Sequence, residues 1–281
     1  MIGRWPLRAR RWMRRSQGRI GRLGPGLITG AADDDPSGIA TYSQAGARYG
    51  YSMLWSVLFT LPLMAAIQIV SARIGYVTGR GLAANIRKHF PRPVLLGVVG
   101  LLLAANTLNI SADIAAMAEV LRLLLGGSAH VYAITFGLTC LVMQVFLPYA
   151  SVVRWLKWLT LALLAYVAVA FSLQLDWWLV LQRTFLPELV WSRELLLTVV
   201  AVLGTTISPY LFFWQAAQEV EERHLHHRSS DGEPRSLAQV HRHLRRIQWD
   251  TNVGMLFSNL VAFFIILSTA ATLHASGITS I

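Results

Sequence analysis

The sequence has 281 residues, of which 54% are hydrophobic and only 14% are charged, whereas soluble domains carry roughly 25% charged residues. This composition excludes a disordered chain and an ordinary soluble enzyme. The single cysteine, Cys140, excludes an intramolecular disulfide and a cysteine-rich metal site. A net charge of +11 is also found in nucleic-acid-binding proteins. Here, however, Lys and Arg lie between long apolar runs, so we expect a polytopic membrane protein without a nucleic-acid partner.

Seven apolar runs predict seven transmembrane helices, because a helix needs about 20 residues to cross the bilayer core. The runs are 24–46, 52–74, 93–125, 130–150, 156–175, 194–216 and 251–274. The third run is long enough to tilt or to project beyond the bilayer. Residues 176–193 are rich in Trp and Leu, which is typical of an interfacial or extracellular segment.

The distribution of basic residues predicts the orientation of the chain. Of the 25 Lys and Arg residues, 21 lie in the tail 1–23 or in the segments after the second, fourth and sixth runs, counting Arg73 and Lys157 at the ends of the adjoining runs. Basic segments stay on the cytoplasmic side, so we expect a cytoplasmic N-terminal tail in the cell (plasma) membrane. The tail is not a signal peptide, because three aspartates follow in the first run and no cleavage pattern is present. Residues 217–250 form the longest hydrophilic segment, which we interpret as a solvated cytoplasmic loop, although its histidines leave metal binding open.

Two of the runs are interrupted near their middle. In the first, Asp33, Asp34 and Asp35 precede Pro36 and Ser37. Proline removes a backbone donor and clashes with the preceding turn, so the helix is expected to break beside the carboxylates. Oxygen ligands of this kind suit a divalent cation.

The sixth run contains a matching interruption, Gly204-Thr-Thr-Ile-Ser-Pro209-Tyr210. Two broken helices at corresponding positions of two halves indicate a transporter's substrate site. Two unrelated proline kinks are the simpler alternative. The third run adds Asn109, Asp113 and Glu119, which could line an ion path or only fix helix packing.

Three stretches of the sequence resemble the natural resistance-associated macrophage protein (NRAMP) family of divalent metal transporters. Asp35-Pro36-Ser37-Gly38, followed by Ala-Thr and Gln44-Ala-Gly-Ala, resembles the family's first helix, whose pattern is Asp-Pro-Gly-Asn. The stretch from Leu203 to Tyr210 is similar to Gly-Ala-Thr-Val-Met-Pro-His of its sixth helix, and Ala118-Glu119-Val120 to its third. The resemblance extends from Arg22 onward and implies an all-α membrane protein with the LeuT-like inverted-repeat transporter fold. Residues 24–175 would form the first five-helix repeat, and 194–281 would begin the second with helices six and seven.

The resemblance also assigns candidate metal ligands. It implies Asp35, Gly38, Thr205 and Ser208, where Gly38 replaces the family's asparagine and Ser208 its methionine. A thioether favours soft or borderline metals, whereas Mg²⁺ keeps its waters and prefers oxygen ligands. Together with the resemblance to divergent, magnesium-associated branches of the family, this exchange favours Mg²⁺ or Mn²⁺, with Fe²⁺ possible.

Departures from the family pattern concern proton movement. The family's two sixth-helix histidines become Tyr210 and Gln215, and the acid neighbouring Glu119 becomes Ala116. We therefore expect Asp33, Asp34, Asp113 and Glu119 to serve in the ion path or in coupling, with Tyr210 and Gln215 lining the same path. The helix breaks are assigned to Pro36, Ser37 and Pro209.

The predicted function is transport of a divalent cation by alternating access between the first and sixth helices, with the metal as substrate and no cofactor. The chain ends soon after the seventh run, so we also expect a C-terminally truncated chain. The alternative is a non-transporting fragment that binds metal or assembles with another chain. An intramembrane enzyme is disfavoured because no nucleophile–base pair or HExxH motif is present. An amino-acid transporter is disfavoured because three aspartates would repel a substrate carboxylate.

Overall fold

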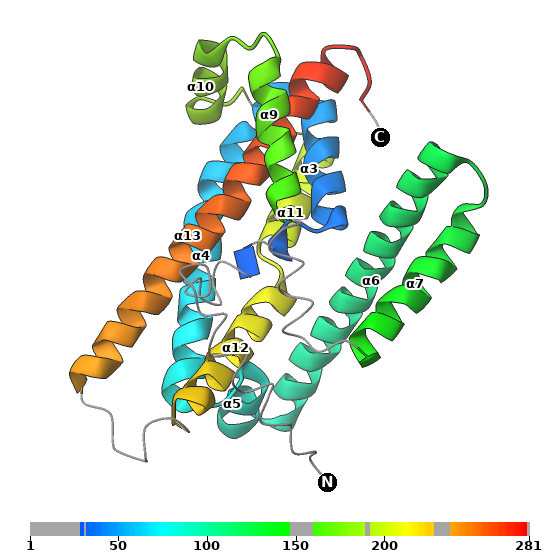
Figure 1. The fold of residues 1–281 in the computed structure, drawn as a ribbon. Coiled ribbons are helices and arrows are strands. Elements are labelled where there is room, and N and C mark those ends of the chain that lie inside the picture. Colours follow the sequence, from blue (N-terminus) through cyan, green and yellow to red (C-terminus); the bar gives the residue numbers. More distant parts are fainter. Residues whose placement is uncertain (1–28, 31, 147–159, 189–191, 228–236, 280–281) are drawn as a thin grey trace.

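The computed structural model describes residues 29–30, 32–146, 160–188, 192–227 and 237–279, and every regular element in these segments is helical. The elements run from blue to red along the chain in Figure 1. They are α3 (Pro36–Tyr49), η2 (Gly50–Met53), α4 (Leu54–Thr78), α5 (Leu82–His89), α6 (Arg92–Leu125), α7 (Ala129–Phe146), η3 (Thr160–Leu163), α9 (Leu164–Ser172), α10 (Trp177–Phe185), α11 (Arg193–Thr206), α12 (Pro209–His227), α13 (Leu237–Thr269) and η4 (Ala270–His274).

Five helical stretches among the described residues are long and apolar enough to cross a membrane. They are Pro36–Thr78, Arg92–Leu125, Ala129–Phe146, Arg193–Arg223 and Leu237–His274. The first of these is 43 residues long and turns back at η2, so that α3 and α4 correspond to two of the predicted runs (Figure 1). In the fifth predicted run, the structure describes only residues 160–175, which contain η3 and α9.

The centre of the molecule is α13, which packs against α3, α4 and α9. Its buried face includes Met255, Ile265 and Ile266, none of them exposed. Glycines permit the closest approaches: a Cβ at Gly46 of α3 would overlap the Ile266 carbonyl oxygen, and one at Gly75 of α4 would overlap that of Ala216. Backbones approach in this way in membrane bundles, where small residues at interfaces replace the hydrophobic effect as the source of tight packing.

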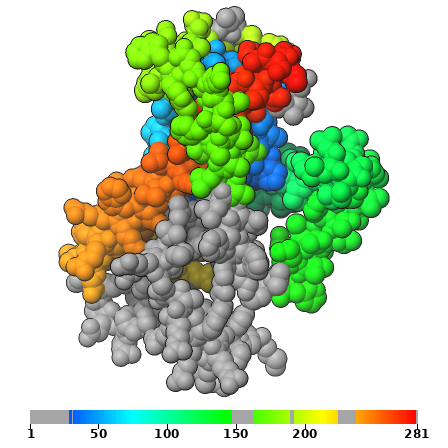
Figure 2. Space-filling model, turned by 45° about the horizontal axis from the view of Figure 1, so that its top comes forward, coloured from blue at the N-terminus to red at the C-terminus, as the bar shows by residue number. Residues whose placement is uncertain are grey.

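Helices α6 and α7 form an antiparallel pair that projects to one side of this centre (Figure 1; Figure 2, green). Ala118 is the only fully buried residue in α6, and α7 has none. Leucines such as Leu101, Leu103 and Leu108 are more than two-thirds exposed. In water such a surface would aggregate, whereas hydrocarbon accepts it, so these faces fit a lipid environment.

One segment differs from the sequence prediction. Residues 217–227 and 237–250, which we had assigned to a hydrophilic loop, continue α12 and begin α13. Helices α12 and α13 extend beyond their apolar runs because Glu, Gln and Arg are strong helix formers. Oppositely charged side chains on the two helices also pair, as Arg246 does with Glu222 at 3.2 Å. Residues 176–193 contain the short helix α10, capped by Asp176 and carrying an exposed Trp178. The basic tail 1–23 lies outside the described residues.

Candidate metal site between two broken helices

The first predicted break is present at Asp34–Asp35. Helical backbone ends at Asp33, Asp34 forms a bend, and Asp35 is extended, with φ −79° and ψ 167°. Asp35 then caps α3, because its Oδ1 accepts hydrogen bonds from the Gly38 amide at 2.7 Å and from Ser37 Oγ at 2.8 Å. Pro36 occupies the first turn, where its missing N–H costs nothing. The motif therefore both ends one helix half and starts the next.

The second break lies at Ile207–Ser208. Helix α11 ends at Thr206, Ile207 leaves helical geometry with φ −107° and ψ 56°, and α12 begins at Pro209. Helix ends leave carbonyl groups unpaired, and Ser208 Oγ meets two of them. It lies 2.6 Å from the Thr205 carbonyl oxygen and 3.3 Å from that of Gly204. The hydroxyl thus stabilises the broken end of α11.

Hydrogen bonds join the two breaks directly. The Tyr210 hydroxyl donates to Oδ2 of Asp35 at 2.8 Å. Two turns beyond Asp35 along α3, the hydroxyls of Tyr42 and Thr206 lie 2.9 Å apart, both buried. The residues implied by the first-helix and sixth-helix motifs therefore meet in space.

Helix α6 contributes a third side to the site. Asn109 Nδ2 donates to Asp35 Oδ2 at 2.8 Å, and the Ser37 amide donates to Asp113 Oδ1 at 3.0 Å. The sequence suggests Asn109 as a residue that could line an ion path, but not as a partner of Asp35. Its four-residue spacing from Asp113, which places both on one face of a helix, was the available signal.

Oxygen atoms surround the position of Gly38. A Cβ placed there would lie 3.2 Å from Asp35 Oδ1, 3.3 Å from Thr205 Oγ1 and 3.4 Å from the Asp33 carbonyl oxygen. Because Gly38 has no side chain, oxygens of both broken helices approach it closely, and even a methyl group would be a tight fit. Oxygen ligands are those preferred by hard divalent cations.

Asp33 and Asp34 face a different neighbour from Asp35. Ser258 Oγ of α13 donates to Asp33 Oδ2 at 2.7 Å and lies 3.4 Å from Asp34 Oδ1. Both aspartates are buried, and Asp33 Oδ1 and Asp34 Oδ2 have no hydrogen-bond partner among the described residues. Asp33 and Asp34 therefore lie on the side of the first break that faces α13.

Two other candidates lie away from these oxygens. Glu119 forms an ion pair with Arg122 one turn along α6, and both side chains are about half exposed. Gln215 is fully buried in α12, and its Nε2 donates to Thr251 Oγ1 at 2.7 Å. Neither residue makes a hydrogen bond to Asp35 in the described part of the chain.

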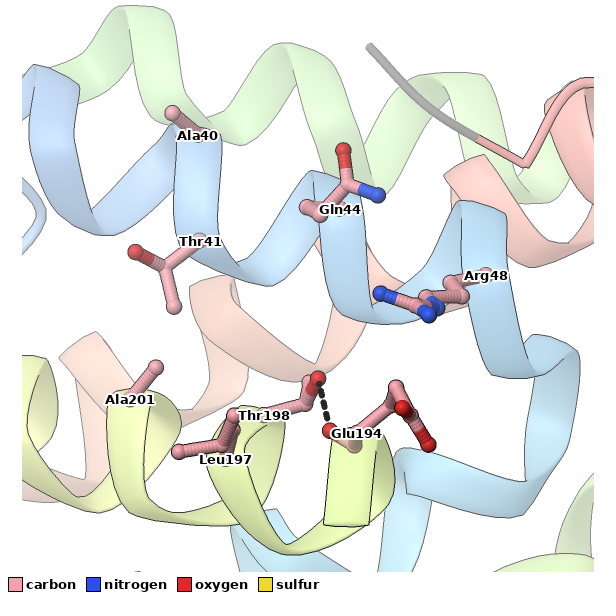
Figure 3. Close-up of a pocket in the computed structure, with 8 residues that line it drawn as sticks. All are labelled: Ala40, Thr41, Gln44, Arg48, Glu194, Leu197, Thr198 and Ala201. Carbon is pink, nitrogen blue, oxygen red and sulfur yellow. Dashed lines mark hydrogen bonds between the residues drawn. The ribbon is translucent and has the colours of Figure 1, made fainter. Parts of the chain in front are cut away.

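A pocket of about 450 Å³ lies further along α3 and α11. Figure 3 shows its lining: Ala40, Thr41, Gln44 and Arg48 from α3, facing Glu194, Leu197, Thr198 and Ala201 from α11. Thr41, which lines the pocket, is three residues beyond Gly38 on α3, and its Oγ1 donates to the Ser37 carbonyl at 2.9 Å. A pocket lined by both polar and apolar side chains thus lies between the same two helices, near the site.

Comparison with known proteins agrees with this arrangement. The family model described as natural resistance-associated macrophage protein-like matches residues 26–281. A divalent metal cation transporter MntH from Verminephrobacter eiseniae (strain EF01-2) is 34% identical over 195 residues, which cover 68% of this chain and 44% of that relative.

Solved structures match the fold. The manganese transporter of Eremococcus coleocola, in complex with an aromatic bis-isothiourea substituted compound, superposes with a TM-score of 0.71 at 18% identity. The match covers 89% of this chain and 51% of that one, and a point mutant of the same transporter matches with a TM-score of 0.68. The chain spans about half the length of these relatives. Since the family model covers nearly all of the sequence and the fold agrees, the chain belongs to the natural resistance-associated macrophage protein-like family.

Proposed function

We propose that this chain binds a divalent metal cation between its two broken helices and carries it across the membrane by alternating access. The ion would be the transported substrate, with Asp35, Gly38, Thr205 and Ser208 forming its site. The observation that carries the proposal is the group of three oxygens around Gly38, contributed by the first and sixth helices. Broken helices expose backbone carbonyls at mid-membrane only where they line a cavity or a site.

The donor set favours a partly hydrated ion, because Mg²⁺ keeps several of its waters and is held through only one or two carboxylates. Among the three oxygens around Gly38, Asp35 supplies the one side-chain carboxylate. Ser208, in place of a thioether, removes the soft ligand that favours transition metals. We therefore propose Mg²⁺ or Mn²⁺ as substrates ahead of Fe²⁺. The MntH relative is named as a divalent metal cation transporter, and the solved structure is that of a manganese transporter.

The remaining polar residues define a path for the ion or for a coupled proton. Asp113 and Tyr210 contact the same hydrogen-bonded group as Asp35. The Asp33 carbonyl oxygen lies beside Gly38, and Ser258 connects the side chains of Asp33 and Asp34. We propose that these four residues line the path near the site, and that Glu119 and Gln215 act further along it.

The membrane setting follows from the helices. Five stretches are apolar enough to span a bilayer, and the basic residues of the sequence favour a cytoplasmic N-terminus in the plasma membrane. On this proposal the partners of the chain are the metal ion and the lipid bilayer.

The test is a pair of measurements on the full chain, wild type and Asp35→Ala. Isothermal titration with Mg²⁺, Mn²⁺ and Cd²⁺ measures binding, and Mn²⁺ quenching of a dye inside proteoliposomes measures flux. Mg²⁺ binding and Mn²⁺ flux that are both lost in Asp35→Ala support the proposal. Mg²⁺ binding without flux in the wild type would favour the alternative of a metal-binding, non-transporting chain. Mg²⁺ binding and Mn²⁺ flux that persist in Asp35→Ala would overturn the assignment of the site.

A further inference from the structure

A second group of metal-binding side chains lies at the other end of α12. Glu219 and Glu222 are one turn apart on α12, and His243 faces them from α13. One ligand atom from each lies within 4.8 Å of the others. Glu219 is ten residues beyond Pro209, and a helix rises 1.5 Å per residue, so this group is about 15 Å from the break that holds the first site.

The central carboxylate of this group is buried without a complete set of hydrogen bonds. Glu219 is 1% exposed, and its Oε2 has no hydrogen-bond partner among the described residues. A buried carboxylate oxygen is costly unless a donor or a cation compensates it. Its ion-pair partner is His243, whose Nε2 lies 3.6 Å from Glu219 Oε2.

That distance is informative. Nitrogen–oxygen hydrogen bonds are 2.7–3.2 Å long, so 3.6 Å is too long for a good one. Two ligands that share one ion at about 2.1 Å in tetrahedral geometry are separated by about 3.4 Å. The separation of Glu219 and His243 therefore fits two ligands of one ion better than a direct hydrogen bond.

The surroundings orient the histidine and set the local charge. The His243 ring stacks on Tyr76 of α4, with ring centroids 4.2 Å apart and an interplanar angle of 15°. Asp250 adds negative charge within electrostatic range of Glu219. Arg246 pairs with Glu222 at 3.2 Å, so an incoming cation would compete with that ion pair for one of the three ligands.

We propose that Glu219, Glu222 and His243 form a second divalent-cation site that joins α12 to α13. Two carboxylates and one imidazole favour borderline ions such as Zn²⁺ or Fe²⁺, and admit Mn²⁺ through the carboxylates, over Mg²⁺, which prefers oxygen alone. The site is independent of the transport site in its ligands. Because α12 is one half of a broken helix, a cation bound here clamps that half to α13.

The test uses the full chain in detergent micelles with Asp35→Ala, which silences the first site. Titration with Zn²⁺ should give one bound ion per chain, with Mg²⁺ at least tenfold weaker. Adding Glu219→Gln or His243→Ala should weaken Zn²⁺ binding at least tenfold. The matched controls Glu221→Gln and His241→Ala alter exposed residues of the same helices and should leave the affinity unchanged.

A spectroscopic measurement covers the case in which a variant fails to fold. Mn²⁺ bound to the Asp35→Ala chain should give electron spin-echo modulation from a histidine nitrogen. Absence of this nitrogen signal, or Zn²⁺ binding that survives both Glu219→Gln and His243→Ala, would overturn the proposal. Either failure is distinct from failure of the transport proposal, which depends on the loss of Mg²⁺ binding and Mn²⁺ flux in the single variant Asp35→Ala.

Discussion

The hydroxyl of Tyr210 donates a 2.8 Å hydrogen bond to Oδ2 of Asp35, linking residues that are 175 positions apart. Asp35 caps the second half of the first broken helix, and Tyr210 lies in the first turn of α12. One bond therefore connects the two interruptions of the backbone. It also occupies a carboxylate oxygen that a metal ion would otherwise bind.

Replacing Tyr210 should show separately how this hydrogen bond affects the stability of the chain and its affinity for metal. Tyr210→Phe removes a hydrogen bond to a carboxylate, which is worth about 1.5–3 kcal/mol, so we expect lower thermal stability of the metal-free chain. Asp35 Oδ2 then keeps only the hydrogen bond from Asn109, so the affinity for Mn²⁺ should rise several-fold, as measured by titration. Tyr132→Phe, which removes a hydroxyl that donates to the Gly126 carbonyl in the turn between α6 and α7, should leave Mn²⁺ affinity unchanged. Weaker Mn²⁺ binding in Tyr210→Phe would mean that the hydroxyl is itself a ligand.

The metal preference should depend on Ser208. Ser208→Met introduces a thioether at the second break, and we expect Cd²⁺ affinity to rise at least tenfold relative to Mg²⁺ because sulfur prefers soft ions. Ser208→Ala serves as the control, since it removes the hydroxyl without adding sulfur. Equal Cd²⁺ affinity in the methionine and alanine variants would show that position 208 does not face the ion.

The space at Gly38 should be necessary for metal binding. Gly38→Ala places a methyl group 3.2–3.4 Å from the three surrounding oxygens, where it would displace a water molecule or the ion. We expect Mn²⁺ affinity to fall at least tenfold, measured by titration at one pH and ionic strength. An unchanged affinity would place the ion elsewhere between the two helices.

The contact between α4 and α12 should depend on Gly75. A Cβ in Gly75→Ala would overlap the Ala216 carbonyl, and overpacking of this kind typically costs about 1–3 kcal/mol. The thermal midpoint of the detergent-solubilised chain should therefore fall. The matched variant Gly97→Ala, in α6, meets no atom within 4 Å, and it should be neutral or stabilising because alanine favours a helix. A similar loss in both variants would argue against a specific α4–α12 contact.

The helical membrane fold and the two breaks follow from the sequence because their causes are local. Apolar length sets where helices can cross a bilayer, and Pro36 and Pro209 each act on the turn that precedes them. Asp35 caps α3 through the amide of Gly38, a contact within three residues. These features could be predicted without knowing what packs against them.

The partners of the polar side chains were decided by tertiary structure. Asn109 reaches Asp35 across 74 positions, and Ser258 reaches Asp33 across 225. Glu119, which we expect in the ion path, pairs with the half-exposed Arg122 one turn along α6 and makes no hydrogen bond to Asp35 among the described residues.

Glu219 and His243 likewise lie opposite each other only because α12 and α13 continue as helices through residues that the sequence analysis assigns to a loop. Hydropathy records how apolar a segment is, but not which helix it will meet. The sequence by itself thus determined the helices, their interruptions and the capping carboxylate. The packing of α13 and α6 against those interruptions decided which oxygens share a site, because long-range contacts depend on the shapes of whole helices rather than on neighbouring residues.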